Sequence, residues 1–168
     1  MAIIDIAPGN HFVGDKETLE RFAGGLIEEY SRIDVLVNNA LPPMLGLEQA
    51  SFEDFQKALT IGVTAPFYLS KLFAPYFTKD AGIINLSSTR FAQSQPQTES
   101  YAAAKGGITS LTHALAMSLA RKGRVNAIAP GWIDTHEDSQ EEADRLQHPV
   151  KRVGVPEDIA NISLFLAF

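Results

Sequence analysis

A tyrosine and a lysine four residues apart are the side chains in this sequence best suited to moving a proton. They occur as Tyr101-Ala-Ala-Ala-Lys105, and on a helix side chains at i and i+4 project from the same face. A phenol with a pKa of about 10 is a poor acid or base at neutral pH, and a nearby cation lowers that pKa. The pair therefore indicates general acid/base chemistry, although an isolated pair of this spacing is usually an exposed Tyr and Lys on an ordinary helix.

A serine upstream strengthens the chemical interpretation of this pair. Ser88 follows a predicted buried strand over residues 82–86 and lies 13 residues before Tyr101. This spacing lets the end of a strand and the following helix converge at the carboxyl edge of a parallel sheet, where open α/β folds bind ligands. Two other predicted strands break into turns at the same edge, at residues 38–40 and 130–131.

The elements that must position these residues alternate between short apolar runs and longer amphipathic stretches. This alternation predicts an α/β fold, a doubly wound parallel sheet, because parallel strands need crossover helices. The predicted strands are 2–6, 35–37, 82–86 and 124–128, with the end of another at 12–15; the predicted helices are 16–31, 51–77, 98–120 and 156–166, and 134–147 is a flap or short helix.

Composition narrows the function further. The chain has 168 residues, 45% hydrophobic and 20% charged, which is typical of one soluble globular domain. Its net charge of −6 argues against nucleic acid and anionic membranes as partners. The start of the sequence lacks signal-peptide features, so we expect a cytoplasmic protein. With no cysteine and four scattered histidines, no metal site is predicted.

Several motifs in the same order along the chain carry a family resemblance. They are Asp5 at a strand end, Gly14-Asp15, the segment 33–40, the spacing of Ser88, Tyr101 and Lys105, and Arg124-Val125-Asn126 followed by Pro130-Gly131. Together they resemble the short-chain dehydrogenase/reductase family over nearly the whole chain. The resemblance implies a Rossmann-type three-layer domain that transfers a hydride between NAD(P) and an alcohol or ketone, because no side chain can carry hydride.

The resemblance also implies roles for individual residues. Tyr101 would be the general acid/base, Ser88 would hydrogen-bond the reacting substrate oxygen, and Lys105 would also reach the nicotinamide ribose. Asp5 would accept hydrogen bonds from the adenosine ribose and repel a 2′-phosphate, which favours NAD over NADP. The other expected cofactor-binding residues are Asp15 near the adenine, Asn39 and Ala40 near the ribose, Ile133 and Thr135 near the carboxamide, and Pro130 and Gly131.

The sequence departs from the family pattern in two ways. The first strand, its Gly-rich turn and the last strand are missing from the given sequence, so residues 1–168 are expected to form an incomplete dinucleotide-binding and catalytic domain. The nine residues between Asp5 and Asp15 are too few for a crossover helix, which suggests ordered segments taken from a longer protein. Leu41 replaces a usual Gly, and Gly62 replaces a usual catalytic Asn, whose water-holding role ordered water or backbone carbonyls could assume.

Alternatives from other classes remain open. One is a non-catalytic dinucleotide-binding or scaffolding homologue, and another is a sugar-nucleotide epimerase-like enzyme. The apolar excess of helices 51–77 and 98–120 predicts a homodimer or homotetramer. Residues 41–47, 90–98 and 134–149 are expected to line the pocket of a small-molecule alcohol or carbonyl substrate, and their mixed composition selects no substrate class.

Overall fold

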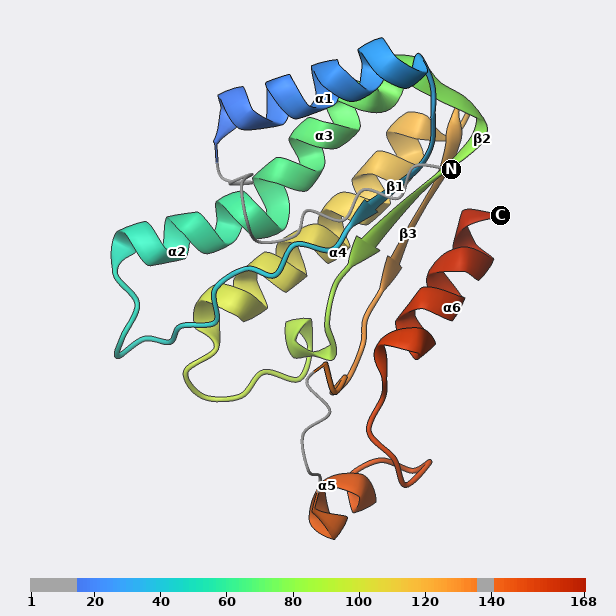
Figure 1. The fold of residues 1–168 in the computed structure, drawn as a ribbon. Coiled ribbons are helices and arrows are strands. Elements are labelled where there is room, and N and C mark those ends of the chain that lie inside the picture. Colours follow the sequence, from blue (N-terminus) through green and yellow to red (C-terminus); the bar gives the residue numbers. More distant parts are fainter. Residues whose placement is uncertain (1–14, 136–140) are drawn as a thin grey trace.

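Three parallel strands form the central sheet of the computed structural model, which describes residues 15–135 and 141–168. Strands β1 (Ile33–Asn38), β2 (Phe77–Leu86) and β3 (Gly123–Ile128) lie in the order β1-β2-β3. Helices α1 (Lys16–Tyr30), α3 (Ala65–Phe73) and α4 (Glu99–Leu119) cover one face, and α6 (Pro156–Ala167) covers the other (Figure 1). This is the predicted doubly wound, three-layer α/β arrangement.

Alternation along the strands divides the core into two layers, because successive strand side chains point to opposite faces. Leu36 and Ile83 pack toward α1 and α3, where Phe73 is fully buried. Their neighbours Val35 and Ile84 pack on the opposite face, against α6. Both faces of the sheet therefore pack against helices, as expected for parallel strands.

The predicted start of the second helix is confirmed. Ser51 caps α2 (Phe52–Leu59): its Oγ accepts from the Asp54 N–H at 3.0 Å, and the Asp54 carboxylate accepts from the Ser51 N–H at 3.1 Å. Such reciprocal bonds satisfy donors that a helix start leaves free. Helices α1, α4 and α6 lie within a residue of their predicted ranges.

The single helix predicted over 51–77 is wrong. After α2, the chain makes a π-helical turn, η1 (Thr60–Thr64), before α3, and a 3-10 turn, η2 (Ala74–Tyr76), ends the run. The Ala65 N–H bonds the Thr60 carbonyl, five residues back. Pro66 has no N–H and so does not bond the Gly62 carbonyl four residues before it. A π turn of this kind is a recognised local accommodation inside α-helices, and apolar spacing alone does not reveal it.

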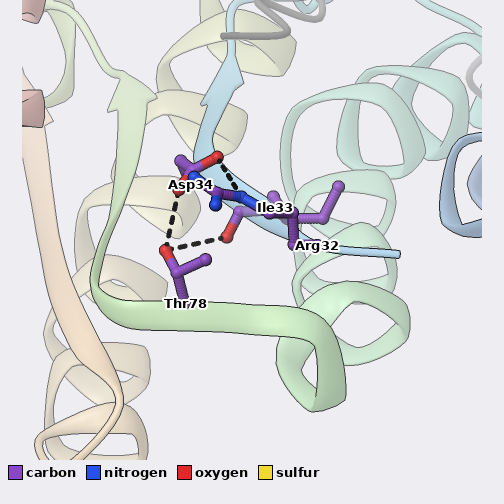
Figure 2. A network of polar contacts seen from close by, with 4 residues as sticks. All are labelled: Arg32, Ile33, Asp34 and Thr78. Atoms are coloured by element: carbon purple, nitrogen blue, oxygen red, sulfur yellow. Dashed lines mark hydrogen bonds and ion pairs between the residues drawn. The ribbon is translucent and has the colours of Figure 1, made fainter. Parts of the chain in front are cut away.

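Strand β2 begins earlier than the predicted 82–86. Figure 2 shows why this polar stretch pairs with β1: the Thr78 hydroxyl donates to the Asp34 carboxylate at 3.1 Å, which also accepts from Arg32 at 2.7 Å. Arg32 holds the pKa of Asp34 below its usual value. Side-chain bonds thus extend a strand where the residues are not apolar.

The remaining predicted elements are partly outside the described residues. Asp15 lies in no strand; it caps α1, and its carboxylate accepts from the Thr18 N–H at 2.9 Å. The predicted strand 2–6 and residues 12–14 lie outside the described residues. Within 134–147, the structure has a short helix, α5 (Glu142–Leu146). None of the helices in the described ranges combines the length and hydropathy needed to span a bilayer.

Candidate active site

Tyr101 and Lys105 lie on one face of the first turns of α4, as their spacing predicts. The Lys105 Nζ is 5.4 Å from the centroid of the Tyr101 ring. Lys105 is 4% exposed, and its ammonium donates to the Leu86 carbonyl at 2.6 Å. Burial lowers the pKa of Lys105 to about 8, so at pH 7 most of the lysine is still a cation. The Tyr101 ring, which is half-buried, therefore lies close to a buried positive charge.

Ser88 is placed by the ends of two adjacent strands. The Ser87 N–H bonds the Ile128 carbonyl at 2.7 Å, and the Thr89 N–H bonds the Pro130 carbonyl at 2.9 Å. These bonds continue the β2–β3 pairing beyond the strands, so Ser88 sits beside the Pro130 turn. Its nearly buried Oγ accepts from the Arg90 N–H at 3.2 Å, at the start of the 3-10 turn η3 (Thr89–Phe91).

Polar side chains that were not predicted as site residues attach α4 to the sheet. The Ser87 hydroxyl donates to the Lys105 carbonyl at 3.0 Å. Deeper in the fold, the Asn85 amide donates to the Thr112 hydroxyl at 2.9 Å and accepts from the Asn38 amide at 2.7 Å. Asn85 is fully buried, and buried polar groups of this kind are costly unless all are paired. In the sequence, the polar Asn85 between the apolar residues Ile84 and Leu86 is the feature from which this buried network could have been predicted.

A second set of contacts ties the loop after β1 to the start of α4. The fully buried Ser100 accepts from the Leu45 N–H and donates to the Pro43 carbonyl, both at 2.9 Å. Gly46 packs so closely that a Cβ there would lie 2.1 Å from the Cα of Gln97. The loop and the helix that carries Tyr101 therefore hold one another in position.

The segment after β3 is fixed by the lead-in to α6. Gly154 accepts from the Asp134 N–H at 2.9 Å and donates to the Trp132 carbonyl at 3.1 Å. A Cβ on Gly154 would lie 2.4 Å from the Ile133 Cδ1, so the Ile133 side chain packs directly against this glycine. These contacts hold Ile133 at the carboxyl edge of the sheet.

Two cavities lie at this edge. The larger, about 870 Å³, is lined by the predicted site residues Asn39, Ser88, Tyr101, Lys105, Pro130, Gly131, Ile133 and Thr135. The predicted pocket ranges contribute Leu41, Pro42, Met44, Arg90, Gln95 and Thr135 to the same lining, and none of residues 141–149. Most of the predicted site residues therefore share one cavity.

The smaller cavity has a volume of about 20 Å³ and is lined by Asn38, Asn39, Ala40, Gly62 and Lys105, among others. A volume of this size accommodates a single water molecule. Ala40 belongs to this cavity rather than to the larger one. Asp15 lines neither cavity, and Asp5 lies outside the described residues, so their cofactor contacts stay predictions.

Known proteins of similar sequence agree with this arrangement. Residues 11–168 match the family model described as enoyl-(acyl carrier protein) reductase. A Thermotoga maritima protein named as an uncharacterized oxidoreductase is 39% identical, with 92% of this chain and 66% of the relative covered. The 3-oxoacyl-acyl-carrier-protein reductase of the same organism is 33% identical, with 92% and 67% covered.

A solved structure supports the same assignment. An apo SCOR enzyme from Clostridium thermocellum has a TM-score of 0.84 and 44% identity, covering 92% of this chain and 64% of that one. The chain belongs to the short-chain dehydrogenase/reductase family, a family of NAD(P)-dependent oxidoreductases. It spans about two thirds of the length of the curated relatives it matches.

Proposed function

We propose that this protein transfers a hydride between NAD and a small-molecule alcohol or ketone, with Tyr101 as the general acid/base. The observation that carries the proposal is the grouping of Ser88, Tyr101 and Lys105 around one cavity. In ketone reduction the Tyr101 hydroxyl gives its proton to the substrate oxygen, and in alcohol oxidation the phenolate takes it back. The Ser88 hydroxyl orients that oxygen by a hydrogen bond.

The residues at the cavity are suited to a nicotinamide cofactor. When bound, the nicotinamide ring would supply or accept the hydride. Lys105 offers ammonium donors to ribose hydroxyls, and Ile133 and Thr135 come from the segment expected near the carboxamide. Selectivity for NAD over NADP is proposed from Asp5, which lies outside the described residues. Cavity volume and donor chemistry both support a dinucleotide here.

Lys105 has two tasks in this proposal. Its ammonium lies 5.4 Å from the Tyr101 ring centroid, which places a positive charge beside the proposed general acid/base. Its ammonium also borders the cavity of about 20 Å³ beside Gly62, where one water would pass the proton onward in place of an asparagine amide. The Leu86 carbonyl holds the ammonium at the junction of the two cavities.

Assembly and location are further parts of the proposal. Phe52 and Phe67, from α2 and α3, and Met117, from α4, are exposed, and apolar surface of this kind marks interaction sites. We therefore propose a homodimer or homotetramer that buries these side chains. A cytoplasmic location is proposed with it, and neither nucleic acid nor a membrane is expected as a partner.

The alternative is a homologue that binds the dinucleotide without catalysis, and Gly62 is the observation that favours it. In that case the protein would bind NADH yet reduce no carbonyl compound. The retention of Ser88, Tyr101 and Lys105 around one cavity argues for catalysis, because a scaffold has no need of all three.

The test is a panel of ketones with NADH or NADPH, and of alcohols with NAD or NADP, using the full-length protein and Tyr101→Phe. We expect Y101F to lower kcat/KM by about 10²- to 10⁴-fold while NADH binding, measured by fluorescence, persists. Tyr76→Phe is the matched control, because Tyr76 lies on η2 away from the cavity. Unchanged turnover in Y101F would remove the central claim, and NADH binding without turnover in the wild type would favour the alternative.

A further inference from the structure

The charge in the larger cavity is opposite in sign to that of the chain. Among the described residues of the lining, the charged side chains are Arg90 and Lys105, and none is Asp or Glu. The whole chain carries 20 acidic and 14 basic residues, for a net charge of −6. A cavity lined by positive charges attracts anions, even in a protein with a negative net charge.

The two cations differ in what they are bound to. Lys105 donates to the Leu86 carbonyl at 2.6 Å and lies beside Tyr101. Arg90 makes a long bond of 3.4 Å from Nη1 to the Gln93 carbonyl. In residues 15–135 and 141–168, no carboxylate forms an ion pair with Arg90. Since a guanidinium has five N–H donors, most of the binding capacity of Arg90 is available to a ligand.

The backbone of Arg90 is fixed close to the reacting centre. Its N–H donates to the Ser88 Oγ at 3.2 Å, and its carbonyl accepts from the Ser94 hydroxyl at 3.1 Å. Arg90 follows Ser88 by two residues in a 3-10 turn, where each residue advances the chain by roughly 2 Å. Arg90 and Ser88 line the same cavity, so the Arg90 side chain borders the space in which a substrate held by Ser88 would lie.

We infer that Arg90 binds an anionic group of the substrate, a carboxylate or a phosphate, so that the preferred substrates are oxo acids or oxo phosphates and the corresponding hydroxy compounds. This inference rests on the proposed function. The planar guanidinium pairs with both anions through two parallel hydrogen bonds. Leu41, Met44 and Trp132 supply apolar surface in the same lining for the body of the substrate.

The test compares charged and neutral members of two substrate pairs, reduced with NADH by the full-length protein. The pairs are 4-oxopentanoate with its methyl ester, and dihydroxyacetone phosphate with dihydroxyacetone. We expect the wild type to favour one charged member by about ten- to a hundredfold in kcat/KM, mainly through KM, as for a charged hydrogen bond. A preference within the first pair would show that the site binds a carboxylate, and a preference within the second would show that it binds a phosphate.

Variants of Arg90 assign the preference to its side chain. Arg90→Gln should lower kcat/KM for the charged member far more than for the neutral member and so remove the preference, and Arg90→Lys should keep part of the preference because the charge remains. Arg121→Gln is the matched control, since Arg121 is exposed and outside the cavity lining. The inference is overturned if the wild type shows no preference, or if R90Q slows both members of a pair equally. It is also overturned if R90Q weakens NADH binding instead.

A separate binding measurement distinguishes failure of this inference from failure of the proposed function. If none of the four compounds is turned over, the panel of ketones and alcohols described above decides the proposed function, and the anion site is judged by thermal unfolding with 4-oxopentanoate, its methyl ester and inorganic phosphate. A rise in the melting temperature caused by an anion, absent in R90Q and absent with the ester, supports the site. No rise in the wild type overturns it.

Discussion

Replacing Lys105 by methionine should stabilise the protein at neutral pH while impairing its proposed catalysis. Lys105 is 4% exposed, and burial lowers its pKa from 10.5 to about 8. Its hydrogen bond to the neutral Leu86 carbonyl replaces part of the hydration that an ammonium loses on burial. The fold therefore carries an unfavourable charge at the position where the proposed mechanism needs one.

The magnitude follows from the change in the pKa of Lys105. Each pKa unit corresponds to about 1.4 kcal/mol, so a fall from 10.5 to about 8 destabilises the folded state by about 3 kcal/mol at pH 7. Because the folded pKa is the lower one, the unfolded state binds more protons between the two values. Stability therefore rises with pH over this window, and about 1 kcal/mol of the penalty should remain at pH 10.

Urea unfolding at pH 7 and pH 10 measures this effect directly. The variant K105M keeps most of the side-chain volume and removes the charge, so its free energy of unfolding should exceed that of the wild type at pH 7. The difference should shrink by about 2 kcal/mol at pH 10. Lys71→Met is the matched control, since Lys71 is exposed on α3, and it should keep the wild-type dependence of stability on pH.

One outcome would refute the reasoning. If K105M and the wild type differ by the same free energy at both pH values, the buried ammonium is not destabilising. A uniform loss of stability in K105M would then report packing of the aliphatic chain alone, and the solvation argument for Lys105 would be abandoned.

Two further predictions concern the residues that position the site. Gly62→Ala should cost about 1–3 kcal/mol in urea unfolding, because its Cβ would lie 2.7 Å from that of Ala104. Its control, Gly24→Ala, should raise the free energy of unfolding by about 0.5–1 kcal/mol, because Gly24 lies inside α1 and no atom lies within 4 Å of a Cβ added there. Equal effects at both glycines would count against a close packing of η1 on α4. Ser100→Ala should cost about 1–3 kcal/mol by leaving the Leu45 N–H unpaired, and should speed hydrogen exchange in residues 43–48. Unaltered exchange there would show that Ser100 does not hold the loop.

Local patterns in the sequence were sufficient to predict the fold class and the candidate site residues Ser88, Tyr101 and Lys105. The Tyr101 and Lys105 spacing needed one helix to place both side chains on a face, and α4 provides it. Ser88 was found from the end of a buried strand, and the start of the second helix was predicted at residue 51, where Ser51 caps α2. Such features depend on residues within a few positions of each other, so periodicity and residue type were sufficient to predict them.

Features that depend on distant residues were decided by the tertiary structure. Ser100 bonds a loop 55 residues away, and Asn38 meets Asn85 across 47 residues. The π turn that divides 51–77 accompanies contact between Gly62 and Ala104 on another helix. The sequence by itself determined which side chains perform the proposed proton transfer. Packing decided which backbone groups hold them and which cations line the larger cavity, because both depend on the approach of segments that the chain order keeps apart.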